Sequence, residues 1–284
     1  MDSTFGFDAR IEDVIRRRCS WRTYDGRPLD DDKRAALAAF MAALGPAPFG
    51  SKTRFALVDA PPGTEEVKGT YGVVTGAHTF IVGAVQDGSR ALEDFGHQME
   101  LIVLKATDLK LATCWLGGTL RRDAFGSSIG VHGGEIVPAV SPVGVSATRR
   151  ALVDSALRLM AASRTRKPWE ELFFDGRFGA PLSTEVAGDL ATPLEMLRLA
   201  PSASNKQPWR VVVENGDAHL FLERTKGYAA MVAVDLQRLD MGIAMCHFAL
   251  AARSVGLDGA WQTHHVSLHM PARTEYCATW TRRK

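Results

Sequence analysis

Two stretches of this chain match each other without a gap, and this internal similarity constrains the fold more than any other feature of the sequence. They are DFGHQMELIVLKATDLKLATCW, residues 94–115, and DMGIAMCHFALAARSVGLDGAW, residues 240–261. The identical pairs are Asp94 and Asp240, Gly96 and Gly242, Met99 and Met245, Leu104 and Leu250, Ala106 and Ala252, Leu111 and Leu257, and Trp115 and Trp261. Apolar residues recur at helical spacing in both, which predicts a long core helix followed by a turn. Two amphipathic helices can look alike by chance, but the shared Asp-x-Gly start and Trp end favour a duplication.

A looser similarity extends to other segments of the two halves. Each half has an apolar, β-branched stretch after an Ala-Pro pair and a helical stretch before it. The predicted strands are residues 54–58, 210–213 and 275–280, and the predicted helices begin at Leu29 and Leu182. Asp30 and Ser183 are placed to cap these two helices. The order of elements predicts an α+β chain in which helices cover sheets.

The boundary between the halves is predicted at the Gly-rich turn of residues 175–179, which follows the charged stretch RTRKPWEELFF. We therefore expect one half over residues 1–174 and a second over residues 175–284. No low-complexity linker separates them, so we expect the halves to pack closely.

Composition narrows the class of protein. The 284 residues are 46% hydrophobic and carry a formal charge of +2, which argues against a disordered chain and against an electrostatic nucleic-acid binder. No apolar run approaches the roughly 18–20 residues that cross a bilayer, and the start MDSTFGFDARIEDVI has acids where a signal peptide has basic and apolar residues. We expect a cytoplasmic protein. The four cysteines form no CxxC pair and the histidines no ligand spacing, so we predict free thiols and no metal site.

Four short segments contain residue types suited to binding a ligand. Residues 16–22, RRRCSWR, place a hydroxyl among arginines, which suits a phosphate, although a basic run is usually a solvated helix end. Residues 201–210, PSASNKQPWR, form a polar loop between prolines that either reads the edge of a heteroaromatic ring or is an ordinary turn before a strand. Residues 113–118, TCWLGG, end in a Gly pair that either lets backbone approach a flat ligand or caps a helix. Residues 164–168, RTRKP, are a second basic cluster.

Taken together, these segments resemble the nitroreductase family of FMN-dependent oxidoreductases. The family pattern has an Arg-x-Ser-x-Arg/Lys start, a Pro-Ser-x-x-Asn-x-Gln-Pro-Trp loop, a Gly-Leu-Gly-Thr-x-Trp-x-Gly turn and a late Arg/Lys-x-Arg-Lys-Pro stretch. The resemblance covers residues 12–174 and, in part, 182–280, and is strongest to the branch in which two nitroreductase-like halves are fused in one chain. It implies a three-layer α/β sandwich that forms a pseudo-dimer within one chain, so that further oligomerisation is not required.

Each half departs from the family pattern in a different place. The first half, which carries the Arg-x-Ser-x-Arg segment, has only Pro-Phe-Gly-Ser-Lys at residues 48–52 where the Pro-Ser-x-x-Asn loop belongs. The second half, which carries that loop, has no Arg-x-Ser-x-Arg segment and no Gly pair at residues 259–263. In family homodimers each flavin takes the arginine segment from one subunit and the loop from the other. The resemblance therefore implies one complete composite site and one dismantled site.

The resemblance also implies roles for individual residues at the complete site. Arg18, Ser20, Arg164 and Arg166 would hold the FMN phosphate and ribityl chain, with Cys19 beside them. Arg22 would lie near the pyrimidine end of the ring, where a cation stabilises the reduced flavin. Pro201, Ser202, Ala203 and Asn205 would contact the ring edge, and the backbone N–H of Gly117 or Gly118 would donate to the flavin N5.

The implied activity is ping-pong electron transfer from NADH or NADPH to a small electron-poor acceptor such as a nitroaromatic or quinone. No nucleic acid or membrane partner is expected. Because the flavin does the chemistry, no catalytic side chain is predicted, and Cys114 is expected to be a buried structural thiol. The alternative is a non-catalytic protein that binds or sequesters flavin, with residues 132–150 as a cover over the site.

Overall fold

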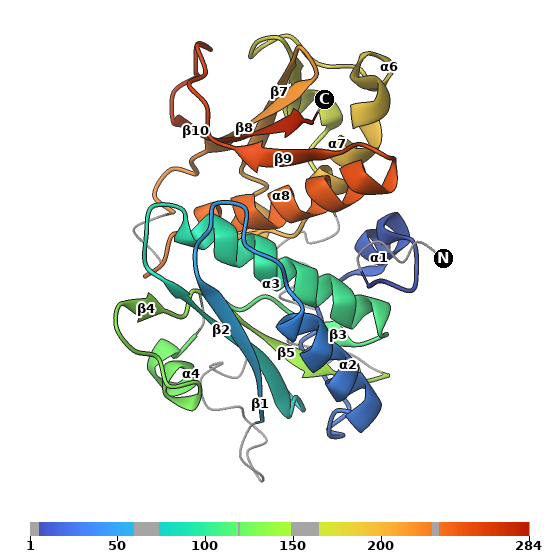
Figure 1. The fold of residues 1–284 in the computed structure, drawn as a ribbon, viewed down its shortest axis with the longest axis vertical. Coiled ribbons are helices and arrows are strands. Elements are labelled where there is room, and N and C mark those ends of the chain that lie inside the picture. The colour runs from blue at the N-terminus through green and yellow to red at the C-terminus, as the bar shows by residue number, and fades with distance from the viewer. Residues whose placement is uncertain (1–5, 60–73, 119, 149–164, 229–232, 284) are drawn as a thin grey trace.

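The computed structural model describes residues 6–59, 74–118, 120–148, 165–228 and 233–283. Two β-sheets lie at opposite ends of the molecule, and two long helices, α3 (Ala91–Asp108) and α8 (Leu236–Ser254), cross between them (Figure 1). These are the helices that the repeated stretches predict, and each begins a few residues before its Asp-x-Gly motif. The predicted α+β fold, with helices packed on sheets, is confirmed.

Both sheets have the same order of strands. In each sheet, two consecutive strands pair, and the second of them pairs with a strand that comes later in the chain. That later strand also pairs with a short strand that directly follows the long helix. All of these pairs are antiparallel. In the first sheet the order is β1 (Thr53–Asp59), β2 (Thr79–Gln86), β5 (Val140–Gly144) and β3 (Ala112–Thr113), with β4 (Glu135–Ile136) beside β2. In the second it is β7 (Trp209–Glu214), β8 (Asp217–Glu223), β10 (Thr274–Arg282) and β9 (Gly259–Gln262). Duplicated halves are expected to share such an order.

One further strand links the halves. β6 (Phe173–Asp175) pairs in parallel with β7, with Phe173 opposite Val211. It lies at the predicted boundary between residues 174 and 175, so the last residues of the predicted first half complete the sheet of the second. Phe173 is fully buried there, which ties this strand firmly to the second sheet.

Two of the shorter helices, α2 and α6, begin where local sequence signals predict, but the helix predicted from Leu182 is interrupted at Gly188, whose φ is 55°. Asp30 caps α2, because its side chain accepts from the N–H groups of Asp32 and Lys33, and Ser183 caps α6 by accepting from the Val186 N–H. The short helices are α1 (Ile11–Arg17), α2 (Asp31–Ala42), α4 (Arg122–Ser128), α6 (Thr184–Ala187) and α7 (Ala191–Arg198), with 3₁₀ turns η2 (Trp169–Glu171), η3 (Gly188–Leu190) and η4 (Ala203–Asn205). In the described part of the chain, no helix combines the length and apolar character needed to cross a bilayer.

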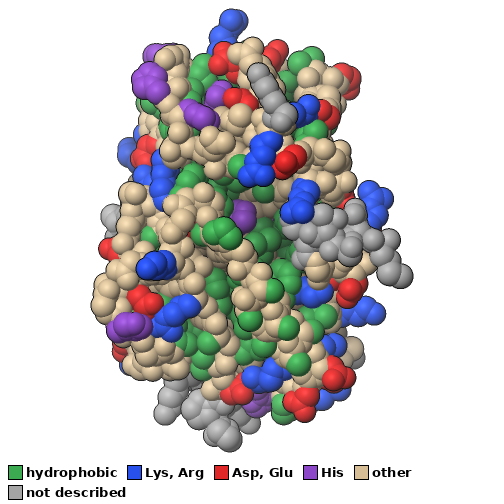
Figure 2. Space-filling view, in the orientation of Figure 1, with side chains coloured by type: hydrophobic (Ala, Val, Ile, Leu, Met, Phe, Trp, Pro, Cys, Tyr) green, Lys and Arg blue, Asp and Glu red, His purple; other side chains and the backbone are tan. Residues whose placement is uncertain are grey.

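The crossing of α3 and α8 depends on two glycines. A Cβ on Gly96 would collide with the Leu239 carbonyl oxygen, and a Cβ on Gly242 would collide with the Glu93 carbonyl oxygen. The contact is reciprocal, since each glycine faces the residue three positions before the other, as in a two-fold interface. Figure 2 shows hydrophobic side chains gathered on the face over these helices, with charged side chains mainly around them.

This crossing predicts a large effect for one methyl group. Gly242→Ala should lower the free energy of unfolding by roughly 3 kcal/mol, because overpacking a close backbone contact typically costs 1–3 kcal/mol. Helix propensity alone predicts the opposite sign, since Ala is about 1 kcal/mol better than Gly inside a helix. Urea denaturation followed by circular dichroism measures the difference. Gly88→Ala is the matched control, because a Cβ on Gly88 meets nothing within 4 Å. Equal stability of the two variants would contradict the close crossing.

Candidate functional site

The segment that follows α1 runs as extended backbone along the first sheet. Ser20 forms a parallel bridge with Thr113, next to the strand that follows α3. The Thr75 N–H donates to the Arg22 carbonyl at 2.9 Å. Residues 18–22 are half-buried, so the first sheet fixes the backbone of the predicted phosphate segment.

The basic run at the start of this segment divides in two. Arg16 and Arg17 end α1 and are exposed, as expected for a solvated helix end. Arg18 is half-buried, and its Nε is buried without a hydrogen-bond partner among the residues that the structure describes. A buried guanidinium N–H without a partner indicates that a further acceptor belongs beside Arg18.

The polar loop of the second half has a strained backbone. Ser204, Asn205 and Gln207 have φ values of 50°, 52° and 49°, in the left-handed region that costs a non-glycine residue about 1–2 kcal/mol. Ser202 closes the loop, because its carbonyl accepts from the Asn205 N–H at 2.9 Å and its Oγ accepts from the Gln207 N–H at 2.8 Å. The loop leads directly into β7, so it is a turn before a strand, and backbone strain of this kind recurs in ligand-contacting loops.

Two buried side chains hold this loop in place. Both carboxyl oxygens of Asp240, on α8, accept from the Ala203 N–H at 3.0 and 3.1 Å. The Gln207 Oε1 accepts from the Lys167 N–H at 2.8 Å and so joins the loop to the late basic segment. Burial raises the pKa of Asp240 well above its usual value, and Asp235 adds to this effect, while the bond from Ala203 opposes it.

Sequence reasoning missed both of these positioning residues. Asp240 aligns with Asp94, and an aspartate repeated at the same helical position in both halves is the signal that could have identified it as a positioning residue. Gln207 lies inside the loop motif, and its buried side chain, 4% exposed, is used within the protein.

Asp94 holds the corresponding loop of the first half in the same way. Its carboxylate accepts from the N–H groups of Phe49 and Ser51, both at 2.8 Å. Phe49 is therefore tied to Asp94 as Ala203 is tied to Asp240. A bulky aromatic side chain stands in the first loop where a methyl group stands in the second.

Charged side chains surround the Phe49 loop. The Arg90 guanidinium lies over the Phe49 ring, 5.5 Å from its centroid, and its Nη1 lies 3.4 Å from Glu93 Oε1. Arg238 from α8 pairs with the same Glu93 oxygen at 2.7 Å. In the ungapped register of the two helices, Arg90 and Glu93 correspond to Leu236 and Leu239. The two loops therefore have different surroundings despite their similar backbones.

Arginines converge beside the second-half loop. Arg166 Nη1 lies 3.5 Å from Asn205 Oδ1. The pKa of Arg166 is lowered to about 10, mainly by burial and also by the charges of Arg18 and Arg198, while Glu195 opposes this shift. Arg198 binds both Glu195 oxygens, at 2.7 and 2.9 Å. The positive charges of Arg18 and Arg166 thus repel one another across a partly buried space, and an anion there would stabilise both.

The Gly117–Gly118 pair and the loop of residues 201–210 are both linked to α8. A Cβ on Gly117 would lie 2.6 Å from the Leu236 Cδ2, so backbone packs directly on this helix. Leu236 lies one helical turn before Asp240, which holds Ala203, and residues four apart share a helix face. Gly117 and Ala203 therefore meet α8 on the same side.

The structure also decides the alternatives at this turn. The helix C-cap interpretation is wrong, because α3 ends at Asp108 and β3 lies between it and Gly117. Cys114 is 2% exposed, as predicted for a structural thiol, but it follows a strand rather than a helix end. The flavin-sequestering alternative used residues 132–150 as a cover, but residues 140–144 form the buried strand β5 and therefore do not cover a site.

The predicted binding residues thus fall into groups. The structure brings Arg18, Arg166 and Asn205 together by charge and hydrogen bonding, and Gly117 and Ala203 together on α8. Cys19, Ser20 and Arg22 follow Arg18 along the first sheet, Gly118 follows Gly117, and Pro201 and Ser202 open the loop. Arg164 lies outside the described residues, as do residues 149 and 150. No group of three His, Cys, Asp or Glu side chains in the described ranges is arranged to hold a metal.

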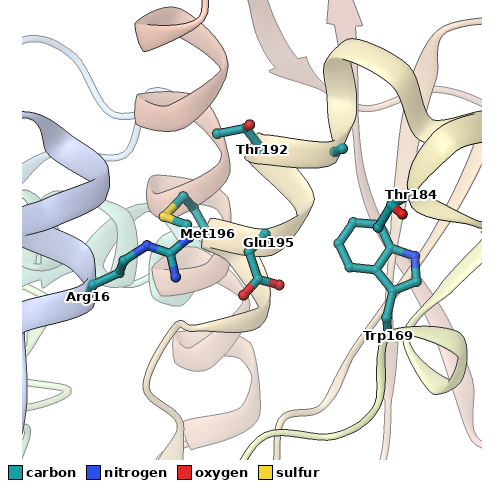
Figure 3. Close-up of a pocket in the computed structure, with 7 residues that line it drawn as sticks. Arg16, Trp169, Thr184, Thr192, Glu195 and Met196 are labelled. Atoms are coloured by element: carbon teal, nitrogen blue, oxygen red, sulfur yellow. The ribbon is translucent and has the colours of Figure 1, made fainter.

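A separate pocket of about 280 Å³ lies along α7 (Figure 3). Arg16 approaches it from α1, and Trp169 and Thr184 lie on the opposite side of α7 from Arg16. The lining residues are Arg16, Trp169, Thr184, Ala191, Thr192, Glu195 and Met196. None of the predicted binding residues lines this pocket, and Glu195, which pairs with Arg198, links it to the arginine cluster.

Comparisons with known proteins agree with this fold. The sequence model of the family described as "Putative TM nitroreductase" matches residues 10–252. A crystal structure described as a "putative nitroreductase" from Thermotoga maritima MSB8 is 19% identical, with a TM-score of 0.61 over 96% of this chain and 92% of that one. An FMN-bound nitroreductase from Desulfitobacterium hafniense DCB-2 is 22% identical, with a TM-score of 0.41 over 50% of this chain and 92% of that one. No curated protein matches the sequence.

The raised pKa of Asp240 makes a prediction for the loop. At about pH 4, Asp240→Asn keeps the shape and the acceptor of a neutral acid and should change the free energy of unfolding by less than about 1 kcal/mol, whereas Asp240→Leu leaves the Ala203 N–H without its acceptor and should cost about 1–3 kcal/mol. A carboxyl whose folded pKa is raised contributes less stability as pH rises from about 4 toward that pKa. The free energy of unfolding of Asp240→Asn should therefore increase relative to that of the unsubstituted protein between pH 4 and pH 8. Urea denaturation at several pH values measures both effects, and a constant difference would contradict the raised pKa.

Proposed function

Because this chain belongs to the nitroreductase family, we propose that it is an FMN-dependent oxidoreductase that passes electrons from NADH or NADPH to a small electron-poor acceptor such as a nitroaromatic or quinone. The observation that supports this best is the convergence of Arg18 and Arg166 beside Asn205, because it joins three sequence-predicted positions from distant parts of the chain. Cofactor, donor and acceptor are part of the proposal.

The residues present fit the phosphate of FMN. The buried Arg18 Nε has no partner among the described residues, and a phosphate oxygen would supply one. A phosphate would also offset the repulsion that lowers the Arg166 pKa. Arg18 and Arg166 would hold the phosphate, with Ser20, Cys19 and Arg164 toward the ribityl chain.

The loop and the glycine turn fit the flat ring. Small side chains at Pro201, Ser202 and Ala203 leave room for a planar group, and the Ser202 hydroxyl, which accepts from Gln207, still has a hydrogen to donate. Asn205, Gly117 or Gly118 and Arg22 would complete the ring contacts. Bound FMN would supply the hydride-accepting chemistry, while the protein orients the ring and sets the charge around it.

We propose that only one such site exists in each chain. The loop that Asp94 holds carries Phe49 with Arg90 packed over its ring, and Glu93 already pairs with Arg90 and Arg238. In this proposal, these side chains occupy the region where a second flavin would otherwise bind and neutralise its charge. The sequence departures and the side-chain contacts therefore support the same asymmetry.

The direct test of the function is anaerobic reduction of the purified, FMN-loaded protein. We expect the flavin absorbance near 450 nm to bleach on addition of NADH or NADPH and to return on addition of a quinone or nitroaromatic. Dithionite is the control, because it reduces accessible flavin without a nicotinamide site. A flavin that dithionite bleaches and neither nicotinamide reduces would instead support the flavin-sequestering alternative.

The phosphate role predicts a difference between two flavins. Arg18→Ala should weaken the binding of FMN by roughly 10- to 100-fold, because a charge-assisted hydrogen bond is worth about 1.5–3 kcal/mol. The same substitution should leave the binding of riboflavin, which has no phosphate, nearly unchanged. Fluorescence titration with each flavin measures the ratio. Arg17→Ala is the matched control, since Arg17 is an exposed neighbour in the same basic run. If Arg18→Ala weakened both flavins equally, Arg18 would not hold the phosphate.

A further inference from the structure

The turn of residues 115–118 is anchored at its first residue by a buried chain of hydrogen bonds. Trp115 Nε1 donates to Glu100 Oε2 at 2.7 Å, Glu100 Oε1 lies 2.8 Å from His247 Nε2, and His247 Nδ1 lies 3.0 Å from the Met196 carbonyl. A carbonyl only accepts, so His247 donates from Nδ1 to Met196, and its other ring nitrogen faces the Glu100 carboxyl. The fully buried Glu100–His247 pair fixes Trp115 across the α3–α8 contact.

A second anchor holds the turn two residues later. Arg122, the first residue of α4, donates from Nη2 to the Gly117 carbonyl at 2.5 Å and lies 3.4 Å from the Pro138 carbonyl. Burial lowers the pKa of Arg122 below its usual value. Arg122 is half-buried, and its two contacts to backbone carbonyls compensate for the loss of water around the guanidinium.

The second anchor also determines where the next N–H points. In a trans peptide, the C=O of Gly117 and the N–H of Gly118 lie in one plane and point in opposite directions. Holding the Gly117 oxygen toward Arg122 therefore directs the Gly118 N–H away from it. Glycine rotates readily at both neighbouring bonds, so the pair would not keep this orientation without an anchor.

We propose that Arg122 is a positioning residue that orients the Gly117–Gly118 peptide and so presents the Gly118 N–H to the flavin ring. This inference rests on the proposed function, because the ring is that of FMN. Arg122 acts through the backbone and not by touching the flavin. Trp115, held by Glu100 and His247, fixes the other end of the turn, so that rotation is restricted to the peptide that Arg122 controls.

The proposal predicts the direction of a redox effect. An N–H that faces the flavin N5 stabilises the oxidised ring, whose N5 accepts a hydrogen bond, more than the reduced ring, whose N5 carries a hydrogen. Loss of this donor therefore raises the midpoint potential. Loss of a cation that acts on the flavin by charge alone would lower it, because the reduced ring is the more negative form.

The experiment compares Arg122→Met with Arg121→Met, a neighbouring substitution of an exposed arginine whose side chain pairs with Asp123. In the FMN-loaded proteins, Arg122→Met should change the ratio of the affinities for oxidised and reduced FMN about tenfold. This change corresponds to a rise in the midpoint potential of about 30 mV for a two-electron couple. Arg121→Met should leave the potential unchanged, and Arg122→Lys, which keeps a donor, should lie closer to the unsubstituted protein. An unchanged or lowered potential in Arg122→Met would overturn the proposal.

A measurement on the unsubstituted protein keeps the test independent of variant folding. FMN should slow hydrogen exchange at the Gly118 amide and not at the Gly117 amide. Exchange at Gly118 that FMN does not slow would overturn the proposal even if the function stands. Failure of the unsubstituted protein to bind FMN at all would overturn the proposed function, and the Arg122 inference with it.

Discussion

The close contact of α3 with α8 at Gly96 and Gly242 is the constraint on which the rest of the structure depends. Because neither glycine has room for a Cβ, the helix backbones touch, and the two sheets are held at a fixed separation. Each helix carries, two residues before its glycine, an aspartate that accepts from a loop N–H. The helix crossing therefore also fixes where the two loops lie.

The two loops held by Asp240 and Asp94 have similar backbone contacts but different side-chain surroundings. Asp240 holds a loop with small side chains beside Arg166, and its helix presents Leu236 to a glycine turn. Asp94 holds a loop in which Phe49 packs under Arg90. The first arrangement places positive charge and small side chains together, as the proposed flavin site requires, whereas the second pairs its aromatic ring and charges within the protein. The asymmetry of the proposed function thus lies in side chains and not in the fold.

Local signals in the sequence predicted the local structure well. Helix periodicity gave the long helices, and Asp30 and Ser183 cap as expected, since a cap bond joins residues two or three apart. Contacts between distant residues were missed, because no local pattern encodes them: the pairing of β6 with β7 and the bond from Ala203 to Asp240 are examples. The glycine pair was open to two interpretations from sequence, and only the position of β3 decided between them.

The number of FMN molecules bound by one chain tests the central claim most directly. Native mass spectrometry of the protein at saturating FMN reports the mass of each complex and therefore also the number of chains in it. We expect one FMN per chain, because Phe49, with Arg90 over its ring, stands where the second loop would contact a flavin and Glu93 pairs with Arg238 beside it. Two FMN molecules per chain with similar affinity would contradict the claim that one composite site is complete and the other is closed.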